Sequence, residues 1–208
     1  MRAFIYVGGT VYPENITEHP KADDITIAAD AGYKNALLLG DKVQILVGDF
    51  DSLDDSTVAE DVKKIQVPAQ KDFTDTQLAV DTALQMGIRD IVIIGGLSGR
   101  LDHTMSNLAI IKELSRQNAF AVITDGKNRV RYISSTSTLI AKSGYKYLSL
   151  IADGDKVKGV DIEGCKYTLK NATISERDQS LTVSNEITGN CALISVRRGG
   201  LYVIESAD

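Results

Sequence analysis

In the first part of the chain, up to Thr124, short runs of apolar residues alternate with segments in which apolar residues recur at helical spacing. Most of the short runs end in glycine or an acidic residue, which predicts buried strands that lead into helices. The predicted strands are residues 2–7, 24–29, 44–47, 64–67, 90–94 and 120–124. The predicted helices are residues 33–39, a segment opened by Thr74 and Gln77 at capping-box spacing, and residues 103–116. This alternation predicts an α/β domain with a mainly parallel, Rossmann-like sheet.

After Asp125 and Gly126 the helical spacing disappears, and short β-rich runs are separated by Gly, Asn, Asp and Ser. These runs are residues 129–133, 137–141, 146–151, 156–162, 167–172, 181–184, 191–197 and 201–204. Strands at such spacing are typical of a small antiparallel sandwich. We therefore expect an α/β domain over residues 1–126 and an all-β sandwich domain over residues 127–208.

The segment GDFDSLDD, residues 48–55, places four aspartates directly after the predicted strand 44–47. Carboxylates this close repel one another unless a cation neutralises them. Oxygen ligands after a glycine suit Mg²⁺, which proteins hold with one or two carboxylates together with substrate phosphates. The alternative is a solvated turn in which Asp or Ser caps a helix that begins near Ser56. The first interpretation predicts phosphate chemistry.

Other predicted strands end in the same way. Asp30 follows the strand 24–29, Asp72 follows the strand 64–67, and Asp102 lies in the loop after the strand 90–94. In an open parallel sheet, ligands bind beyond the carboxyl ends of the strands. We therefore expect one rim to gather five aspartates: Asp30, Asp49, Asp51, Asp72 and Asp102.

The loop GGLSGRLDH, residues 95–103, is a second candidate for ligand binding. Gly95 and Gly96 allow the backbone to come close to a ligand, and the forked guanidinium of Arg100 suits phosphate oxygens. The alternative is a surface ion pair between Arg100 and Asp102, with Asp102 capping the helix from His103 onward. His103 lies in the first helical turn, where a lone histidine is more often structural than catalytic.

The composition of the chain argues against a nucleic-acid-binding protein and against a membrane-spanning one. The chain has 208 residues, a mass of 22.5 kDa, 23 basic against 28 acidic residues, and a net charge of −5. Without a basic run we expect no nucleic-acid partner, and without a run of about 20 apolar residues we expect no membrane span. Cys165 and Cys191 lack metal-ligand spacing, so we expect reduced core thiols in a cytoplasmic protein. The chain also lacks a P-loop and a GxGxxG fingerprint.

Taken in order, the motifs AADAG, GDFDS, KDFTD, GGLSGRLDH, GCKYTL and TVSNE resemble the thiamine pyrophosphokinase family over nearly the whole chain. The resemblance implies an N-terminal α/β domain that binds nucleotide and metal and carries catalysis. It also implies a C-terminal β-sandwich that binds thiamine and forms a homodimer. The implied reaction transfers diphosphate from Mg-ATP to the hydroxyethyl group of thiamine and releases AMP. The acceptor substrate follows from the resemblance alone.

The resemblance also implies residue roles. The residues matching the family's metal and phosphate site are Asp30, Asp49, Asp51 and Asp72. The implied catalytic residues are Asp49, Asp51, Asp72, Arg100 and Asp102, and the implied ATP contacts are Asp30, Gly95, Gly96, Arg100 and His103. The implied thiamine pocket, between the α/β domain of one subunit and the sandwich of its partner, contains Tyr167, Ser184 and Asn185. Two departures are Ala31, where the family usually has glycine, and Tyr167, where the animal enzymes have tryptophan.

Two other functions fit the same residues. The first is a pyrophosphokinase for another hydroxymethylated heterocycle, such as a pterin, because the acidic rim handles phosphates while the pocket selects the acceptor. The second is a non-catalytic sensor that binds a nucleotide or thiamine diphosphate in the same cleft. A pure binder has little need of so many mutually repelling carboxylates, which favours an enzyme.

Overall fold

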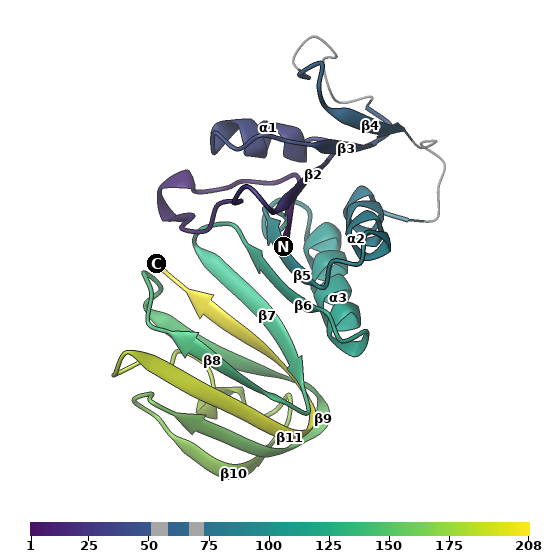
Figure 1. The fold of residues 1–208 in the computed structure, drawn as a ribbon. Coiled ribbons are helices and arrows are strands. Elements are labelled where there is room, and N and C mark those ends of the chain that lie inside the picture. Colours follow the sequence, from purple (N-terminus) through teal and green to yellow (C-terminus); the bar gives the residue numbers. More distant parts are fainter. Residues whose placement is uncertain (51–57, 67–72) are drawn as a thin grey trace. The chain divides into compact units, whose positions relative to one another are not determined.

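The computed structural model describes residues 1–50, 58–66 and 73–208, and the chain divides into two compact units, Met1–Gly126 and Lys127–Asp208 (Figure 1). The predicted combination of a helix-containing first part and a strand-rich second part is confirmed. Two residues of the predicted acidic rim, Asp51 and Asp72, lie outside the described residues, as do Asp54 and Asp55 of the segment GDFDSLDD. Ser56, near which the alternative interpretation expects a helix to begin, also lies outside the described residues.

The first unit is built on parallel strands. They are β1 (Ala3–Tyr6), β2 (Ile25–Ala29), β3 (Ile45–Gly48), β4 (Lys63–Gln66), β5 (Asp90–Ile94) and β6 (Phe120–Thr124). Their order is β6-β5-β1-β2-β3-β4, and every pairing between neighbours is parallel. The carboxyl ends of β5, β1, β2 and β3 are therefore consecutive along one edge of the sheet.

The strands β1, β2, β3 and β5 are buried on both faces, as is typical of parallel sheets, whereas the edge strand β4 is mostly exposed. The helices are α1 (Gly32–Leu38), α2 (Asp75–Gln85) and α3 (Leu101–Arg116), with a 3₁₀ turn, η1, at Pro13–Asn15. Figure 1 shows α1 on one side of the sheet and α2 and α3 on the other. On the α1 side Tyr33 and Ala36 pack against Phe4, Tyr6 and Leu46. No helix within the described residues is long and apolar enough to cross a membrane.

The predicted start of α2 is confirmed at its cap but wrong in one detail. Thr74 is the N-cap, and its Oγ1 accepts a hydrogen bond from the backbone N–H of Gln77 at 3.2 Å. The reciprocal bond of a capping box is missing from the described part of the chain, because Nε2 of Gln77 donates to Oδ1 of Asp81 one turn later, at 2.8 Å.

The second unit is antiparallel. Its strands are β7 (Asn128–Ser134), β8 (Ser137–Ala141), β9 (Tyr147–Glu163), β10 (Leu169–Ile174) and β11 (Cys191–Ser206), with a 3₁₀ turn, η3, at Gln179–Leu181. The strand β11 pairs with β7 at one end, with β8 at the other and with β9 along most of its length, and β10 pairs with β9. One apolar cluster, which includes Leu150, Val160, Ala192 and Val203, fills the interior of this unit.

The second unit corrects several strand predictions. The predicted runs 146–151 and 156–162 form one strand, β9, which begins at Tyr147, and residues 191–197 and 201–204 belong to the single strand β11. A glycine that the sequence suggests to be part of a turn lies instead at an irregularity inside a strand. The pairing of β9 with β11 shifts register between Arg198 and Gly200. Cys165 is buried as expected, but Cys191 is exposed at the start of β11.

Residues 181–184 do not form the predicted strand. The backbone N–H groups of Thr182 and Val183 both donate to the carbonyl of Gln179, so the chain turns at this point. The turn is stabilised upstream by Asp178, whose Oδ2 accepts hydrogen bonds from the N–H and hydroxyl of Ser175. Tyr167 also lies outside a strand, because β10 begins only at Leu169.

Candidate active site

Two of the predicted acidic residues meet at neighbouring strand ends in the first unit. Ala29 is in register with Val47, so Asp30 follows β2 beside Gly48, and Asp49 comes directly after β3. The side chains of Asp30 and Asp49 are both partly buried. A Cβ atom on Gly48 would lie 2.6 Å from Oδ1 of Asp30, so the missing side chain of Gly48 makes room for this carboxylate.

Two glycine turns lie beside these aspartates, Gly8–Gly9 after β1 and Gly95–Gly96 after β5. The N–H of Gly96 donates to the carbonyl of Gly8 at 2.8 Å, which joins the two turns directly. The N–H of Thr10 donates to Oγ of Ser98 at 2.6 Å and adds a second link. Since Gly9, Gly95 and Gly96 all have positive φ, other residues would be strained at these positions.

A cavity of about 240 Å³ opens between the two turns and the start of α3. Its walls include both glycine turns and three side chains, Arg100, His103 and Asn107. Positions 103 and 107 lie one turn apart on one face of α3, and Arg100 is the N-cap of this helix. We predicted Arg100 and His103 but missed Asn107, although its helical spacing from them was visible in the sequence.

Arg100 and Asp102 form the surface ion pair considered as the alternative interpretation of this loop. The Nε–Oδ1 distance is 3.1 Å, the Nη2–Oδ2 distance is 2.5 Å, and both side chains are exposed. Asp102 also accepts from the N–H of His103 at 2.9 Å. Mainly because of the bond from Arg100, the pKa of Asp102 is lowered to about 2, and the pKa of Arg100 is raised. Both groups are therefore charged at neutral pH.

The structure describes two of the four predicted metal ligands. Asp30 and Asp49 lie at adjacent strand ends, whereas Asp51 and Asp72 fall outside the described residues. Among residues 1–50, 58–66 and 73–208, no three His, Cys, Asp or Glu side chains are grouped closely enough to hold a metal ion. Two carboxylates on neighbouring strands are nevertheless donors of the kind that a hard divalent cation prefers.

In the second unit, Asn185 holds the backbone of Tyr167. Its Nδ2 donates to the carbonyl of Tyr167 at 2.7 Å, and its Oδ1 accepts from the N–H of Tyr167 at 3.0 Å. Oδ1 also accepts from the N–H of Glu186 at 2.9 Å, and the residue is only 3% exposed. Both ends of the Asn185 amide are thus engaged by protein, which makes it a support for Tyr167.

Tyr167 itself is 58% exposed and presents its ring outside the strands. The Nζ atom of Lys166 lies 5.6 Å from the ring centroid and 3.3 Å from Oε1 of Glu186, and the contact with Glu186 raises the pKa of Lys166. Ser184 is also exposed, with a φ of 60°, and its N–H donates to Oγ of Ser149 at 3.0 Å. The hydroxyl of Ser184 therefore lies at an accessible turn.

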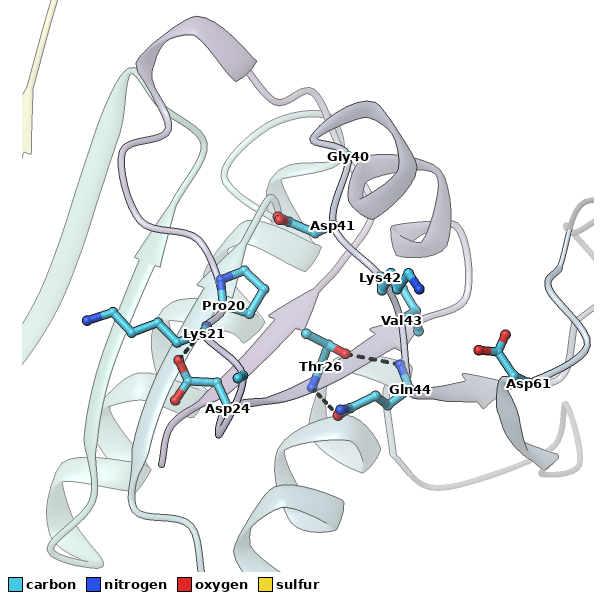
Figure 2. Close-up of a pocket in the computed structure, with 11 residues that line it drawn as sticks. Pro20, Lys21, Asp24, Thr26, Gly40, Asp41, Lys42, Val43, Gln44 and Asp61 are labelled. Carbon is cyan, nitrogen blue, oxygen red and sulfur yellow. Dashed lines mark hydrogen bonds between the residues drawn. The ribbon is translucent and has the colours of Figure 1, made fainter.

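A larger cavity, about 540 Å³, lies at the opposite edge of the first unit's sheet, near the amino ends of β2 and β3. Figure 2 shows Thr26 and Gln44 in its wall, where each side chain accepts from the other residue's backbone N–H. Asp24 accepts from the N–H groups of Arg2 and Lys21. Because Thr26 and Gln44 bond to each other and the cavity lies away from the carboxyl ends of the strands, this cavity is a poor candidate for the active site.

Comparison with known proteins gives two family-model matches in chain order. Residues 17–123 match the catalytic domain of thiamin pyrophosphokinase, and residues 136–201 match its vitamin B1 binding domain. The thiamine pyrophosphokinase of Bacillus subtilis is 28% identical over 199 residues, which cover 93% of this chain and 92% of that protein. A crystal structure of thiamine pyrophosphokinase from the same organism aligns with a TM-score of 0.89, 26% identity and full coverage of both chains. A thiamin pyrophosphokinase family protein from Enterococcus faecalis aligns with a TM-score of 0.81 and 30% identity, again over both full chains.

Proposed function

The chain belongs to the thiamine pyrophosphokinase family, and we propose that it transfers the diphosphate group of Mg-ATP to the hydroxyethyl oxygen of thiamine, releasing AMP. Synthesis of thiamine diphosphate from thiamine is the activity of this family. The observation that supports the proposal is that two carboxylates and two glycine turns follow the carboxyl ends of four consecutive parallel strands, and that the glycine turns line a cavity with Arg100. This edge belongs to the part of the chain that matches the catalytic-domain model.

In this proposal the first unit is a Rossmann-like nucleotide-binding domain, and Mg²⁺ is the divalent ion of the reaction. Asp30 and Asp49 would hold the ion, with Asp51 and Asp72 completing its protein ligands. The space that Gly48 leaves for the Asp30 carboxylate fits this role, because a close side chain would displace an oxygen donor. When bound, the ion neutralises charge on the phosphate oxygens of ATP.

Arg100, His103 and the glycine turns would surround the phosphates. The thiamine hydroxyl oxygen forms a new bond to the β-phosphorus, the bond from this phosphorus to the oxygen bridging to the α-phosphate breaks, and AMP departs. The hydroxyl proton must pass to a base. Asp102 is a weak base because its pKa is about 2, so it is better suited to hold Arg100. This leaves Asp72 as the stronger candidate to orient or deprotonate the hydroxyl.

The second unit would bind the thiamine ring and form the homodimer, with the active site at the subunit interface. Thiamine carries a positively charged thiazolium ring, which is attracted to the face of an aromatic side chain. The exposed ring of Tyr167 supports this role, and the hydroxyl of Ser184 is available to a ligand at the neighbouring turn. Asn185 would act through Tyr167, because its own amide already bonds to protein. The expected cytoplasmic location stays a prediction.

A panel of acceptors tests this function against the two alternatives. The purified chain is incubated with Mg-ATP and either thiamine or a hydroxymethylpterin, and the diphosphate ester of each acceptor is measured. Turnover of thiamine alone supports the proposal, whereas preferred turnover of the pterin identifies a different pyrophosphokinase. Binding of thiamine diphosphate without turnover of either acceptor identifies a sensor.

A further inference from the structure

Two asparagine side chains, one from each helix beside the glycine turns, bond to the backbone of these turns. Nδ2 of Asn35 in α1 donates to the carbonyls of Val7 and Gly9, at 2.7 and 3.0 Å. Nδ2 of Asn107 in α3 donates to the carbonyl of Gly96 at 3.0 Å, and Asn107 is only 5% exposed. Each asparagine therefore fixes the peptide orientation of one turn.

The fit between these amides and the turns is close. A Cβ atom on Gly96 would lie 2.5 Å from Nδ2 of Asn107, and one on Gly95 would lie 3.3 Å from Nδ2 of Asn35. Any side chain at Gly96 would therefore displace the Asn107 amide. Because glycine is the residue with the greatest backbone freedom, a turn built from glycines needs such external bonds to keep one conformation.

These bonds leave several backbone N–H groups available beside the cavity. The N–H groups of Gly8, Gly9, Ser98 and Gly99 make no hydrogen bond to any residue in the described part of the chain, and all four residues line the cavity with Arg100. Successive backbone N–H groups in such turns form concave sites for anions. Asn35 and Asn107 meanwhile donate to carbonyls of the same two turns, those of Val7, Gly9 and Gly96.

We propose that Asn35 and Asn107 are positioning residues that hold the two glycine turns as a cradle, in which the N–H groups of Gly8, Gly9, Ser98 and Gly99 bind the phosphate oxygens of the nucleotide. This inference rests on the proposed function and adds the residues that shape its phosphate site. Both asparagines act through the backbone and do not touch the reacting atoms. A neutral amide suits the task, because an aspartate would repel the same carbonyls and the phosphates.

The test compares three variants, Asn107→Ala, Asn107→Leu and Asn35→Ala, with the wild-type chain. Binding of inorganic diphosphate and of Mg-ATP is measured by calorimetry, and KM and kcat are measured for both substrates. We expect each variant to bind diphosphate and Mg-ATP about tenfold more weakly, the effect of losing one well-placed hydrogen bond. We expect the KM for ATP to rise as binding weakens, whereas the KM for thiamine stays at the wild-type value.

Asn118→Gly is the matched control. Asn118 is an exposed asparagine just beyond the other end of α3, and its φ of 55° is one that glycine adopts readily. This variant should bind diphosphate and turn over both substrates as the wild type does. The leucine variant fills the volume of the Asn107 side chain without a donor, so it separates the lost hydrogen bond from a lost contact.

The possible outcomes distinguish the cradle from the proposed reaction. If a folded variant binds diphosphate as tightly as the wild type does, or if the KM for thiamine rises equally, the cradle is overturned. If none of the variants folds, Asn35 and Asn107 are structural core residues and the cradle is likewise overturned. If the wild type makes no thiamine diphosphate but binds diphosphate through these asparagines, the cradle stands and the proposed function fails.

Discussion

Gly48 and Asp30 are in contact across two neighbouring strands, and only glycine at position 48 permits it. A Cβ atom on Gly48 would lie 2.6 Å from Oδ1 and 3.1 Å from Cγ of Asp30. Asp30 itself follows β2 with a φ of 48°, a conformation that aspartate tolerates better than most residues. The position of the Asp30 carboxylate therefore depends on the absence of a side chain on the adjacent strand.

Gly48→Ala tests whether this placement matters for catalysis. The added methyl group forces the Asp30 carboxylate to move, and a displacement of about 1 Å at a reacting centre costs about a hundredfold in rate. We expect kcat/KM to fall by about this factor and the Mg²⁺ requirement to rise. Gly144→Ala is the control, because nothing lies within 4 Å of a Cβ atom there. Equal activity of the two variants would remove Asp30 from the active site.

In the AADAG motif, position 31 accepts either alanine or glycine, whereas position 32 requires glycine. Ala31 has ordinary helical angles, φ −56° and ψ −14°, at the N-cap of α1, so the glycine usual in the family is not required there. A Cβ atom on Gly32 would instead lie 2.0 Å from the carbonyl oxygen of Tyr6. We expect Ala31→Gly to change the free energy of unfolding by less than about 0.5 kcal/mol, and Gly32→Ala to lower it by about 3 kcal/mol. Denaturant unfolding of both variants measures the difference, and equal stabilities would contradict the close packing of α1 on β1.

The pH dependence follows from the pair of Arg100 and Asp102. The pKa of Asp102 is lowered from 3.8 to about 2, so the pair stabilises the fold above about pH 4 and this contribution is lost as the pH falls toward 2. Asp102 stays ionised throughout the working range and adds no inflection to the activity profile between about pH 5 and 9. Asp102→Asn should therefore lower kcat without moving either limb of a plot of kcat/KM against pH. Disappearance of the acidic limb would show that Asp102 is the base after all.

Asn185→Ala tests whether the Asn185 amide holds Tyr167 in position for thiamine. The variant loses the two hydrogen bonds to the Tyr167 backbone and leaves their partly buried partners without these bonds, at a cost of about 1 kcal/mol in the free energy of unfolding. We expect the KM for thiamine to rise while the KM for ATP is unchanged. Asn190→Ala, at an exposed position, is the control. A parallel rise in both KM values would argue against a thiamine-specific role for Tyr167.

The sequence predicted the strands of the first unit closely, since each buried strand there is a compact apolar run that ends at a turn residue. Strands β5 and β6 begin and end at the predicted residues. Prediction was less accurate in the second unit, because a glycine within an apolar run marks a hairpin turn and a bulge equally well. Gly154 and Gly199 have φ values of 103° and 101°, and both lie inside long strands.

The candidate site was predictable where a charged residue directly follows a strand, as Asp30 and Asp49 do, or lies in a glycine-rich loop after one, as Arg100 does. Asn107 was missed because an asparagine inside a helix gives no sign that it bonds to a distant carbonyl. Asn185 was predicted as a ligand contact by resemblance, but the fold turns its amide toward Tyr167. Such choices between a ligand and the backbone are made by tertiary packing, which local sequence does not encode.

The measurement that tests the central claim most directly is identification of both products after incubation with Mg-ATP and thiamine. Diphosphate transfer predicts AMP and thiamine diphosphate in equal amounts, with no thiamine monophosphate formed first. Formation of ADP with thiamine monophosphate would contradict the account, because it would show that the γ-phosphoryl group alone is transferred.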